Sequence, residues 1–376
     1  MKILFAGGGT GGHFYPIIAV AEAVRAVAER ERIVGLELYY MSDDPYNKEL
    51  LERAELKYIE VKSGKMRTYF SVKNITDIGK TIVGVFNALG RLFVLYPDVV
   101  FGKGGYASFP AIAAARILRI PVVIHESDIS PGRVNKWVAP YAAKIAISYP
   151  ETLKYFTKKD RVALTGLPIR QEITHANIPE DPHETFHLEH DLPVILVLGG
   201  SLGSENINES LIDILPQLLE NYQVIHQTGK DNFAWMEQRA TTVLQKHEHT
   251  ERYKPVPYME MHALLQAAAV ADLVISRAGS TIFEIAMWGK PSIIIPLSIA
   301  RGDHQRENAY SYARTGAATV IEEQNLKPTL FFSIVDRLMK DPEERARMSS
   351  ATSQFVHKDA AERIAEALLA IGLAHS

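Results

Sequence analysis

Short apolar runs alternate with longer amphipathic stretches along the whole chain. Runs of four to six mostly apolar residues are typical of strands buried on both faces of a sheet. They cover residues 2–6, 36–41, 97–101, 121–125 and 144–148 in the first half and 193–198, 223–226, 271–276, 292–296 and 317–321 in the second. Helical patterns, such as those at 15–29 and 109–118, lie between them. This alternation predicts an α/β protein whose parallel sheets carry helices on both faces.

Both halves begin with a strand, a glycine-rich turn and a helix. Residues 7–13 read Gly-Gly-Gly-Thr-Gly-Gly-His, and residues 199–204 read Gly-Gly-Ser-Leu-Gly-Ser. Glycines let the backbone approach a phosphate closely, and the N-terminus of the following helix supplies N–H donors and a positive dipole. We therefore expect two nucleotide-fold domains, at 1–172 and 193–355, with ligands bound between the carboxyl ends of their strands.

The segment at 173–192 separates the two halves. It is polar and contains prolines and four histidines, a composition typical of a linker or hinge. Histidines can ligate metals, but these histidines lack regular helical spacing. We therefore expect a solvated connector here rather than a metal site.

Composition and charge narrow the class of protein. The 376 residues carry 41 Lys and Arg against 44 Asp and Glu, a net charge of −3, which does not favour a nucleic-acid partner. The absence of cysteine excludes disulfides, thiolate metal ligands and cysteine nucleophiles. No apolar run reaches the length of about 18 residues that a transmembrane helix needs, and the first run is too short for a signal peptide. We expect a cytoplasmic protein that can still touch a membrane surface.

The glycine turn at 7–13 offers the first candidate chemistry. It contains a G-x-G-x-x-G match, which also fits an NAD-dependent dehydrogenase. Such an enzyme needs an acidic residue about 20 residues further on, whereas Asp43 and Asp44 come roughly 30 residues after the loop. A dinucleotide fold does not require a histidine at the predicted helix start, but an enzyme that deprotonates a hydroxyl does. His13 is therefore a candidate general base.

A second group of polar residues follows later strands of the first half. Tyr106 lies in another glycine-rich turn, at 102–108, and the sequence His125, Glu126, Ser127, Asp128 closes the strand at 121–125. Because the carboxyl ends of parallel strands share one rim, we expect these side chains near His13. Asp128 and Glu126 compete with His13 as the base, while a structural pair of His125 with Glu126 is the alternative.

The turn at 276–284 is the main candidate for donor binding in the second half. Gly279 and the small hydroxyl residues Ser280 and Thr281 suit close approach to a phosphate or a ribose. Glu284 stands one helical turn further, where its carboxylate can accept hydrogen bonds from two adjacent ribose hydroxyls. A capping box, in which Ser280 or Thr281 pairs with Glu284, is the alternative.

The segment at 303–308 begins a further helix after the strand at 292–296. Its side chains His304, Gln305 and Asn308 suit hydrogen bonds to sugar hydroxyls, with an ordinary exposed first turn as the alternative. The chain has no Walker loop, zinc-ligand pattern or Gly-x-Ser-x-Gly elbow. We expect no cofactor and no protein-bound metal, so backbone amides, helix dipoles and Arg170 would stabilise a leaving diphosphate.

Taken together, these motifs closely resemble those of the MurG family, the UDP-N-acetylglucosamine–N-acetylmuramyl-(pentapeptide) pyrophosphoryl-undecaprenol N-acetylglucosaminyltransferases. The similarity runs in order over nearly the whole chain, at residues 7–13, 104–108, 125–128, 166–170, 199–201, 226–230 and 276–279. It implies a GT-B fold, which has two Rossmann-like domains facing a cleft, with a C-terminal helix at about 356–376 that packs back onto the first domain. The first domain would form the acceptor and membrane side and the second the UDP-GlcNAc side.

The resemblance also implies a reaction. GlcNAc would pass with inversion from UDP-GlcNAc to the 4-hydroxyl of MurNAc in undecaprenyl-pyrophosphoryl-MurNAc-pentapeptide (lipid I), giving lipid II for peptidoglycan synthesis. The enzyme would work as a peripheral protein on the cytoplasmic face of the cell membrane. Its partners would be UDP-GlcNAc, lipid I, an anionic membrane surface and other cell-wall synthesis proteins, with no nucleic acid.

Site residues carry over from the family by position. The resemblance implies that His13 and Asp128 are the catalytic candidates. The donor would contact Thr10, Gly11, Gly12, Asp128, Arg170, Ser201, Met259, Ser280, Thr281, Glu284, His304, Gln305 and Asn308, with Ser201 near the diphosphate, Met259 against the uracil and Glu284 on the ribose. The acceptor would contact Thr10, His13, Tyr106 and Glu126.

A helical pattern at 72–96 bears on membrane association. Apolar residues at three- and four-residue steps predict one buried stripe: Val72, Ile75, Ile78, Ile82, Val85, Leu89, Leu92 and Tyr96. Val83, Phe86 and Phe93 widen the stripe beyond what packing requires. Residues 61–103 contain seven basic and two acidic residues, a local net charge of +5 in a chain of −3. Docking on anionic lipid is the hypothesis, and a core helix with a solvated basic face is the alternative.

Four other functions stay open from the residues alone. A UDP-GlcNAc epimerase also uses twin nucleotide folds but would convert the soluble sugar nucleotide without a lipid acceptor. A UDP-sugar transferase for another polyprenyl or lipid acceptor would need the same motifs. Cofactor binding would identify a dehydrogenase, and absence of turnover would identify a module that only binds sugar nucleotides.

Overall fold

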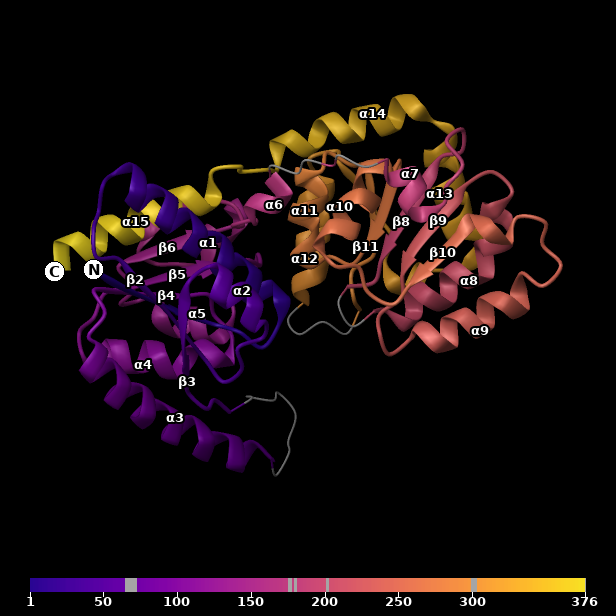
Figure 1. Ribbon diagram of the computed structural model, residues 1–376. Helices are drawn as coiled ribbons and strands as arrows, with labels where there is room; N and C mark the ends of the chain where they lie inside the picture. The colour runs from indigo at the N-terminus through magenta and orange to yellow at the C-terminus, as the bar shows by residue number, and fades with distance from the viewer. Residues whose placement is uncertain (65–72, 175–177, 179–180, 201–202, 299–302, 376) are drawn as a thin grey trace. The chain divides into compact units, whose positions relative to one another are not determined.

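The computed structural model describes residues 1–64, 73–174, 178, 181–200, 203–298 and 303–375 (Figure 1). The contacts divide the chain into two compact units, one formed by Met1–Arg170 with His357–Ser376 and the other by Gln171–Val356. The first unit therefore ends two residues before the boundary expected at 172, and the chain returns to it at the C-terminus.

The first unit is built on a seven-stranded parallel sheet. Its strand order is β3-β2-β1-β4-β5-β6-β7, and the strands are β1 (Lys2–Ala6), β2 (Glu37–Ser42), β3 (Leu56–Glu60), β4 (Val99–Gly102), β5 (Val122–Glu126), β6 (Lys144–Ile147) and β7 (Val162–Leu164). The order reverses direction between β1 and β4, where Ala6 pairs with Gly102. Parallel sheets bind ligands at such a switch point, beyond the carboxyl ends of the strands.

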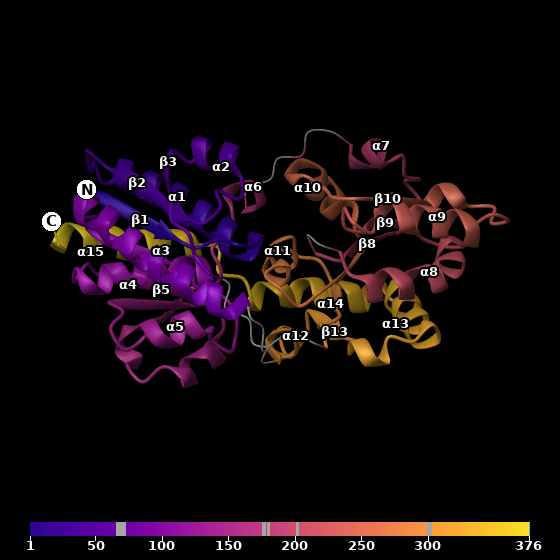
Figure 2. The ribbon, with the colours of Figure 1, turned by 90° about the horizontal axis from the view of Figure 1, so that it is seen from below.

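Helices cover both faces of this sheet (Figures 1 and 2). On one face, Ile3 and Phe5 of β1 pack against α1 (Gly11–Arg30) and α15 (Ala360–His375). On the other face, Leu4 and Ala6 pack in a core with α3 (Lys73–Leu95) and α4 (Phe109–Ile117). The alternation of β1 side chains between two cores explains why this strand is apolar at nearly every position. The short helices α2 (Lys48–Arg53) and α5 (Arg133–Val138) complete the unit.

The second unit repeats the design with six parallel strands in the order β10-β9-β8-β11-β12-β13. The strands are β8 (Val194–Leu198), β9 (Gln223–Gln227), β10 (Tyr253–Val256), β11 (Leu273–Ser276), β12 (Ser292–Ile294) and β13 (Ala318–Val320). The switch point lies between β8 and β11, where Leu198 pairs with Ser276. The residues that follow these two strands, at 199–200 and at 277–280, therefore leave the sheet side by side.

The helices of the second unit are α6 (Gln171–Thr174), α7 (Pro182–Phe186), α8 (Glu205–Leu219), α9 (Phe233–Val243), α10 (Met261–Val270), α11 (Thr281–Met287), α12 (His304–Ala313), α13 (Pro328–Lys340) and α14 (Pro342–Ala351). Ile195 and Val197 of β8 form the main core with side chains of α8 and α13. Helices α6 and α7 lie within or at the border of the segment expected as a linker at 173–192, so that segment has regular structure of its own.

The predicted apolar stripe of α3 is partly wrong. Ala88 and Leu92 are buried, as a packing face requires, but Ile82 is exposed along the helix and Tyr96 is exposed just after it ends. Residue 72 lies outside the described residues, and the side chains at 75 and 78 are likewise not described. The contact of α3 with its unit therefore combines the small Ala88 with Leu92, and not every residue of the predicted stripe takes part. Within the described parts of the chain, every helix is too short or too polar to span a bilayer.

Candidate functional site

The loop after β1 has a backbone that only glycine can adopt comfortably. Gly8 and Gly9 have φ values of 137° and 82°, which L-residues with side chains rarely take. A Cβ on Gly8 would also stand 2.4 Å from the hydroxyl oxygen of Ser42. The loop delivers the chain to Thr10, the N-cap of α1, whose side chain makes no capping hydrogen bond. The first turn of α1 is thus arranged to offer backbone N–H groups to an anion.

His13 stands in that first turn. Its Nδ1 lies 3.0 Å from the Thr10 hydroxyl oxygen, and its ring packs on Gly105, where an added Cβ would be 3.3 Å from the imidazole Cε1. Burial lowers the pKa of His13 to about 4, and the positive charge of Lys103 adds to the effect while Asp128 opposes it. The ring is therefore neutral near pH 7 and able to accept a proton.

Lys103 is the member of this site that the sequence did not single out. Its side chain is 1% exposed, and its ammonium nitrogen has no hydrogen-bond partner among the described residues. Burial lowers the pKa of Lys103 to about 8, although the carboxylates of Glu126 and Asp128 raise it. Buried polar groups in folded proteins are nearly always paired, so a lysine in this state next to a candidate base points to a functional position.

Glu126 organises the loop that follows β5. One carboxylate oxygen accepts from Asp128 N at 3.0 Å, and the other accepts from Gly132 N and Asn135 Nδ2, both at 2.9 Å. Burial raises the pKa of Glu126, as does the nearby Asp128 charge. Since both oxygens are already engaged, Glu126 is better suited to holding this loop than to moving a proton.

The alternative pairing of His125 with Glu126 does not form. His125 is fully buried, and its Nε2 donates to Gly166 O at 3.0 Å. Burial lowers the pKa of His125 well below its usual value, and the Lys103 charge lowers it further. His125 is therefore a neutral structural residue between β5 and the segment after β7.

The remaining predicted residues of the first unit lie around the same rim. The Tyr106 ring lies on Gly9, whose Cβ would be 2.9 Å from the Tyr106 hydroxyl. Asp128 is partly buried, and its charge acts on both His13 and Lys103. The guanidinium of Arg170 stacks 4.1 Å above the ring centre of Tyr15 on α1. The structure thus gathers His13, Tyr106 and Asp128 around Lys103 and the glycine loops.

In the second unit, the glycine loop after β8 is held by its neighbours. Gly203 has a φ of 78°, and a Cβ there would stand 2.1 Å from the backbone oxygen of Thr228. Gln227 at the end of β9 donates to Gly200 O at 3.3 Å and accepts from Met259 N at 2.9 Å. This buried amide therefore fixes the position of Met259 against the glycine loop. Ser201 lies outside the described residues.

Helix α11 begins in the turn at 276–284, where the sequence analysis predicts the ribose contact. Ser280 is its N-cap but makes no side-chain capping hydrogen bond, and Thr281 is its first residue, so the capping box does not form at Ser280. Glu284 follows one turn later and is partly exposed.

Helix α12 contributes one buried and two partly exposed candidates. Asn308 is buried, and its amide donates to Ala278 O at 3.3 Å. Gln305 is partly exposed, and its side-chain oxygen accepts from Leu297 N at 3.0 Å. His304, also partly exposed, is the first residue of the helix. These contacts tie α12 to the turn before α11 and to the segment after β12.

An ion pair that the sequence did not reveal joins three loops of this rim. The Arg277 guanidinium pairs with Glu323 and also donates to Ser204 Oγ at 2.5 Å. Burial opposes ionisation of Glu323, but hydrogen bonds from the Ser298 hydroxyl and backbone, Asn206 and Arg277 lower its pKa to about 2. Arg277 drew attention in the sequence only because it lies in the glycine motif at 276–284. Glu323 could not be predicted as its partner, because the two residues are distant along the chain.

Two family models match the chain. The glycosyltransferase family 28 N-terminal domain matches residues 3–147 and the family 28 C-terminal domain matches residues 194–364. A UDP-N-acetylglucosamine–N-acetylmuramyl-(pentapeptide) pyrophosphoryl-undecaprenol N-acetylglucosamine transferase from Clostridium novyi is 35% identical over 94% of both chains. The chain belongs to the MurG family. This confirms the predicted resemblance.

Solved structures agree with that membership. The crystal structure of Acinetobacter baumannii MurG is 25% identical, with a TM-score of 0.73 over 98% of this chain and 99% of that one. This confirms the predicted fold class of two Rossmann-like, parallel-sheet domains. A UDP-GlcNAc 2-epimerase from Neisseria meningitidis has a TM-score of 0.71 over 98% of this chain and 100% of that one, at 15% identity. That second likeness extends to the fold alone.

Proposed function

We propose that this MurG-family chain transfers GlcNAc from UDP-GlcNAc to the 4-hydroxyl of MurNAc in lipid I and so makes lipid II for peptidoglycan synthesis. The observation that carries the proposal is the 35% identity over 94% of the chain with a transferase named for this donor and this acceptor. The two glycine loops with their switch-point positions supply the phosphate-binding geometry that both substrates need.

The reaction is a direct displacement at the anomeric carbon. A bond forms between the acceptor O4 and C1 of GlcNAc, the bond from C1 to the UDP oxygen breaks, and the configuration at C1 inverts. The O4 proton passes to a base, for which neutral His13 is our first choice because Lys103 and burial keep its pKa low. Asp128, on the same rim, is the competing base. Thr10 and Tyr106 would orient the acceptor near His13.

Donor binding is assigned to the rim of the second sheet. The loop at 199–204, including Ser201, and the first turn of α8 would hold the diphosphate, while Met259 would lie against the uracil. Glu284, partly exposed one turn into α11, would accept from the ribose hydroxyls. Gln305 and His304 would contact the sugar, and buried Asn308 would hold the turn that carries Ser280 and Thr281.

Charge on the leaving diphosphate would be stabilised by the protein alone. Backbone amides of the glycine loops, helix N-termini and the guanidinium of Arg170 are the groups suited to this. The backbone amides of Gly11 and Gly12, in the first turn of α1, would also stabilise the diphosphate. Asp128 would be a further contact of the donor. No protein-bound metal is required in this scheme, so chelators should leave the protein's own chemistry intact.

We also propose that the enzyme docks on an anionic membrane through α3. Phe86 and Phe93 are 70% and 71% exposed, and Ile82, Val83 and Val94 extend the same apolar face. Exposed Lys80 and Arg91 lie beside it. An apolar helix face flanked by basic residues suits the interface of an anionic bilayer, where a polyprenyl-linked acceptor resides.

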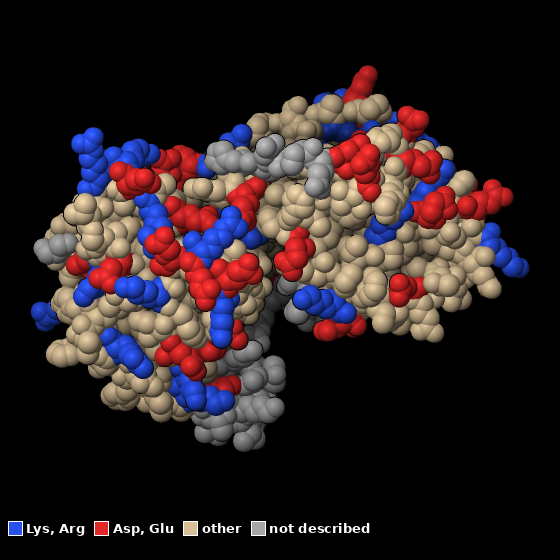
Figure 3. Space-filling model, viewed as in Figure 1, with Lys and Arg blue, Asp and Glu red and all other residues tan. Residues whose placement is uncertain are grey.

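The proposal includes action at the cytoplasmic face of the cell membrane, where other cell-wall synthesis proteins would be its neighbours. Elsewhere, acidic and basic side chains are interspersed on the face drawn in Figure 3, a distribution that does not favour a nucleic-acid partner.

One assay tests the proposed transfer. Labelled UDP-GlcNAc is offered to the enzyme with and without a lipid I analogue, and both products are separated. We expect labelled lipid II only when the acceptor is present. Conversion of UDP-GlcNAc alone would instead identify an epimerase, and transfer only to a different polyprenyl acceptor would correct the acceptor assignment.

A further inference from the structure

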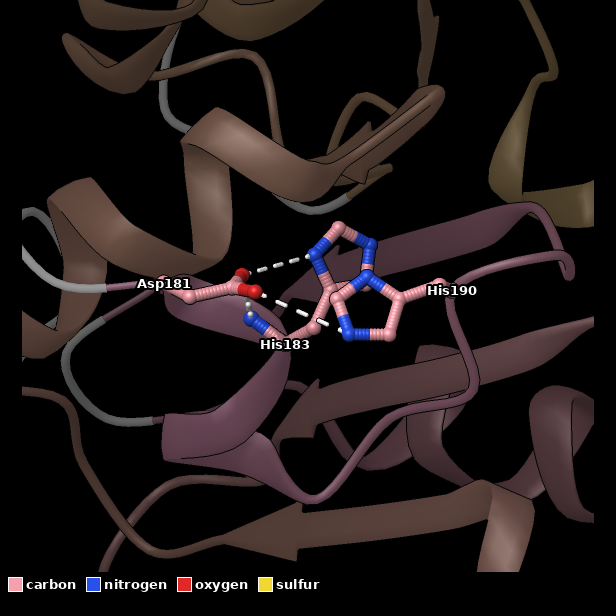
Figure 4. Close-up of side chains that lie close together, drawn as sticks. All are labelled: Asp181, His183 and His190. Carbon is pink, nitrogen blue, oxygen red and sulfur yellow. Dashed lines mark hydrogen bonds and ion pairs between the residues drawn. The ribbon is translucent and has the colours of Figure 1, made fainter.

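The segment between the two sheets gathers three side chains that commonly ligate metals. Asp181 is the N-cap of α7, His183 lies in the first turn of that helix, and His190 follows shortly before β8. One donor atom from each residue lies within 4.8 Å of the other two. Figure 4 shows the two imidazoles stacked beside the carboxylate. Two of the four histidines of this segment, His183 and His190, therefore lie together beside a carboxylate.

The local fold brings these residues together. Asp181 accepts from His183 N at 2.9 Å, and Pro182 fixes the first helical position. The helix then ends at His187, whose φ of 51° turns the chain back, and Leu188 N donates to His183 O at 2.8 Å. This reversal carries His190 to the side of α7 that holds Asp181 and His183.

The spacing of the donor atoms suits a tetrahedral ion. Asp181 Oδ1 lies 3.1 Å from His183 Nδ1, and Asp181 Oδ2 lies 3.6 Å from His190 Nε2. Ligands about 2.0–2.1 Å from a tetrahedral zinc are roughly 3.3 Å apart. The imidazole centres are 4.5 Å apart with their planes at 23°, so a modest ring rotation would direct both nitrogens at one ion.

The orientation of the carboxylate and the exposure of the three side chains also suit the binding of a metal ion. The Asp181 carboxylate accepts from the backbone N–H of His183 and lies beside its Nδ1, which orients its oxygens toward the imidazoles. The side chains of Asp181, His183 and His190 are 41%, 25% and 65% exposed. They line an open hollow of about 570 Å³ with Leu192, Pro193 and Val270, so an ion can reach them from solvent.

We propose that Asp181, His183 and His190 bind one divalent transition-metal ion of the zinc type. Two imidazoles and one carboxylate are the donor set that zinc takes when a fourth position stays open to water. The ion would link the start of α7 to the chain just before β8 and stabilise this connector. The proposal rests on the connector geometry and is independent of the proposed sugar transfer.

The test is a calorimetric titration of the tag-free, full-length protein with Zn²⁺ in a buffer free of chelating anions. The variants are His183→Gln and His190→Gln. The matched control is His187→Asn, which removes a histidine of the same helix end while asparagine tolerates its positive φ. We expect the wild type and the control to bind one equivalent alike, and each Gln variant to bind at least about tenfold more weakly.

A melting experiment gives a second readout. Free Zn²⁺ at about ten times the wild-type Kd should raise the Tm of the wild type and of His187→Asn by roughly 3 °C and that of His190→Gln by about 1 °C or less. The proposal is overturned if the wild type binds no Zn²⁺. It is also overturned if both Gln variants bind as the wild type does, because the ion would then sit on other histidines among the 13 of the chain.

Discussion

At the scale of single residues, the rim of the first sheet works as one electrostatic unit. Lys103 is buried among groups that it influences, and its charge lowers the pKa of His13 while Asp128 raises it. Burial and the neighbouring cation keep His13 neutral, so its free nitrogen is available to a proton at neutral pH, but the low pKa also makes it a weaker base. Lys103 therefore affects both the neutral fraction of His13 and its strength as a base.

Replacement of the proposed base gives the first prediction. His13→Ala should lower the turnover of UDP-GlcNAc with lipid I analogue by about 10²- to 10⁴-fold, the range typical of general-base help. Binding of UDP-GlcNAc, measured by calorimetry, should persist because His13 is assigned to the acceptor and most of the proposed donor contacts lie on the second unit. Near wild-type turnover in His13→Ala, together with loss in Asp128→Ala, would identify Asp128 as the base.

The pH dependence tests the role of Lys103. Because the pKa of His13 is lowered to about 4, the ring stays neutral, and transfer should persist, well below pH 6. Lys103→Met removes one of the two causes that lower this pKa, so the pKa rises and activity should fall at a higher pH on the acid side. The measurement is kcat/KM against pH, with Lys246→Met, at an exposed lysine outside the proposed sites, as the control. An unchanged acid limb in Lys103→Met would show that the lysine does not act on the base.

The ribose contact gives a third prediction. A hydrogen bond to a charged acceptor is worth about 1.5–3 kcal/mol, so Glu284→Ala should weaken use of UDP-GlcNAc by about 10- to 100-fold without unfolding the protein. Exposed Glu343 on α14 supplies the control variant Glu343→Ala. The same donor KM in Glu284→Ala and in the wild type would show that the ribose is bound elsewhere.

At the scale of elements, α3 departs most from what its sequence pattern predicted. Burial of Ala88 and Leu92 with exposure of Phe86 and Phe93 means that Leu92 packs against the unit while both phenylalanines face away from it. Exposed phenylalanines on one side of a helix form an apolar patch, and such patches commonly mark interaction sites. The pattern alone could not distinguish this face from the packed one because both contain apolar residues at helical spacing.

Vesicle binding tests that face. Phe86→Ser with Phe93→Ser should reduce sedimentation with anionic vesicles at least about tenfold, since each phenylalanine contributes roughly 1.5–3 kcal/mol when it leaves water. Leu373→Ser removes an exposed apolar residue of α15 and is the control. Wild-type binding should fall as salt rises. Equal binding to neutral and anionic vesicles would contradict the basic contribution of Lys80 and Arg91.

At the scale of the whole molecule, the fold does not distinguish transferase from epimerase. Both classes share the paired Rossmann-like sheets, as the TM-scores of 0.73 and 0.71 show. Sequence similarity distinguishes them, because it extends at 35% identity over 94% of the chain to a named transferase. The choice between the two classes therefore rests on sequence similarity and not on the fold.

Most strands in the interior of both sheets were predictable because their positions are apolar on both faces. Residues 2–6 and 193–198 gave β1 and β8 to within a residue. The strands that the pattern missed, β3, β7 and β10, all lie at sheet edges. Strand β3 contains Lys57 and Glu60, β10 contains Pro255, and β7 is only three residues long. Local hydrophobicity therefore does not distinguish these edge strands from loops.

The sequence by itself determined the alternation of strands and helices, the glycine turns at 7–13 and 199–204, and the membership of the MurG family. The elements and turns depend on residues that are close along the chain, and the family membership depends on motifs that can be compared directly between sequences. Tertiary structure alone decided that Lys103 is buried beside His13, that Arg277 pairs with Glu323, and that His190 returns to Asp181. The physical reason is that desolvation and ion pairing depend on strand order and chain reversal, which bring together residues whose separation along the chain carries no local signal.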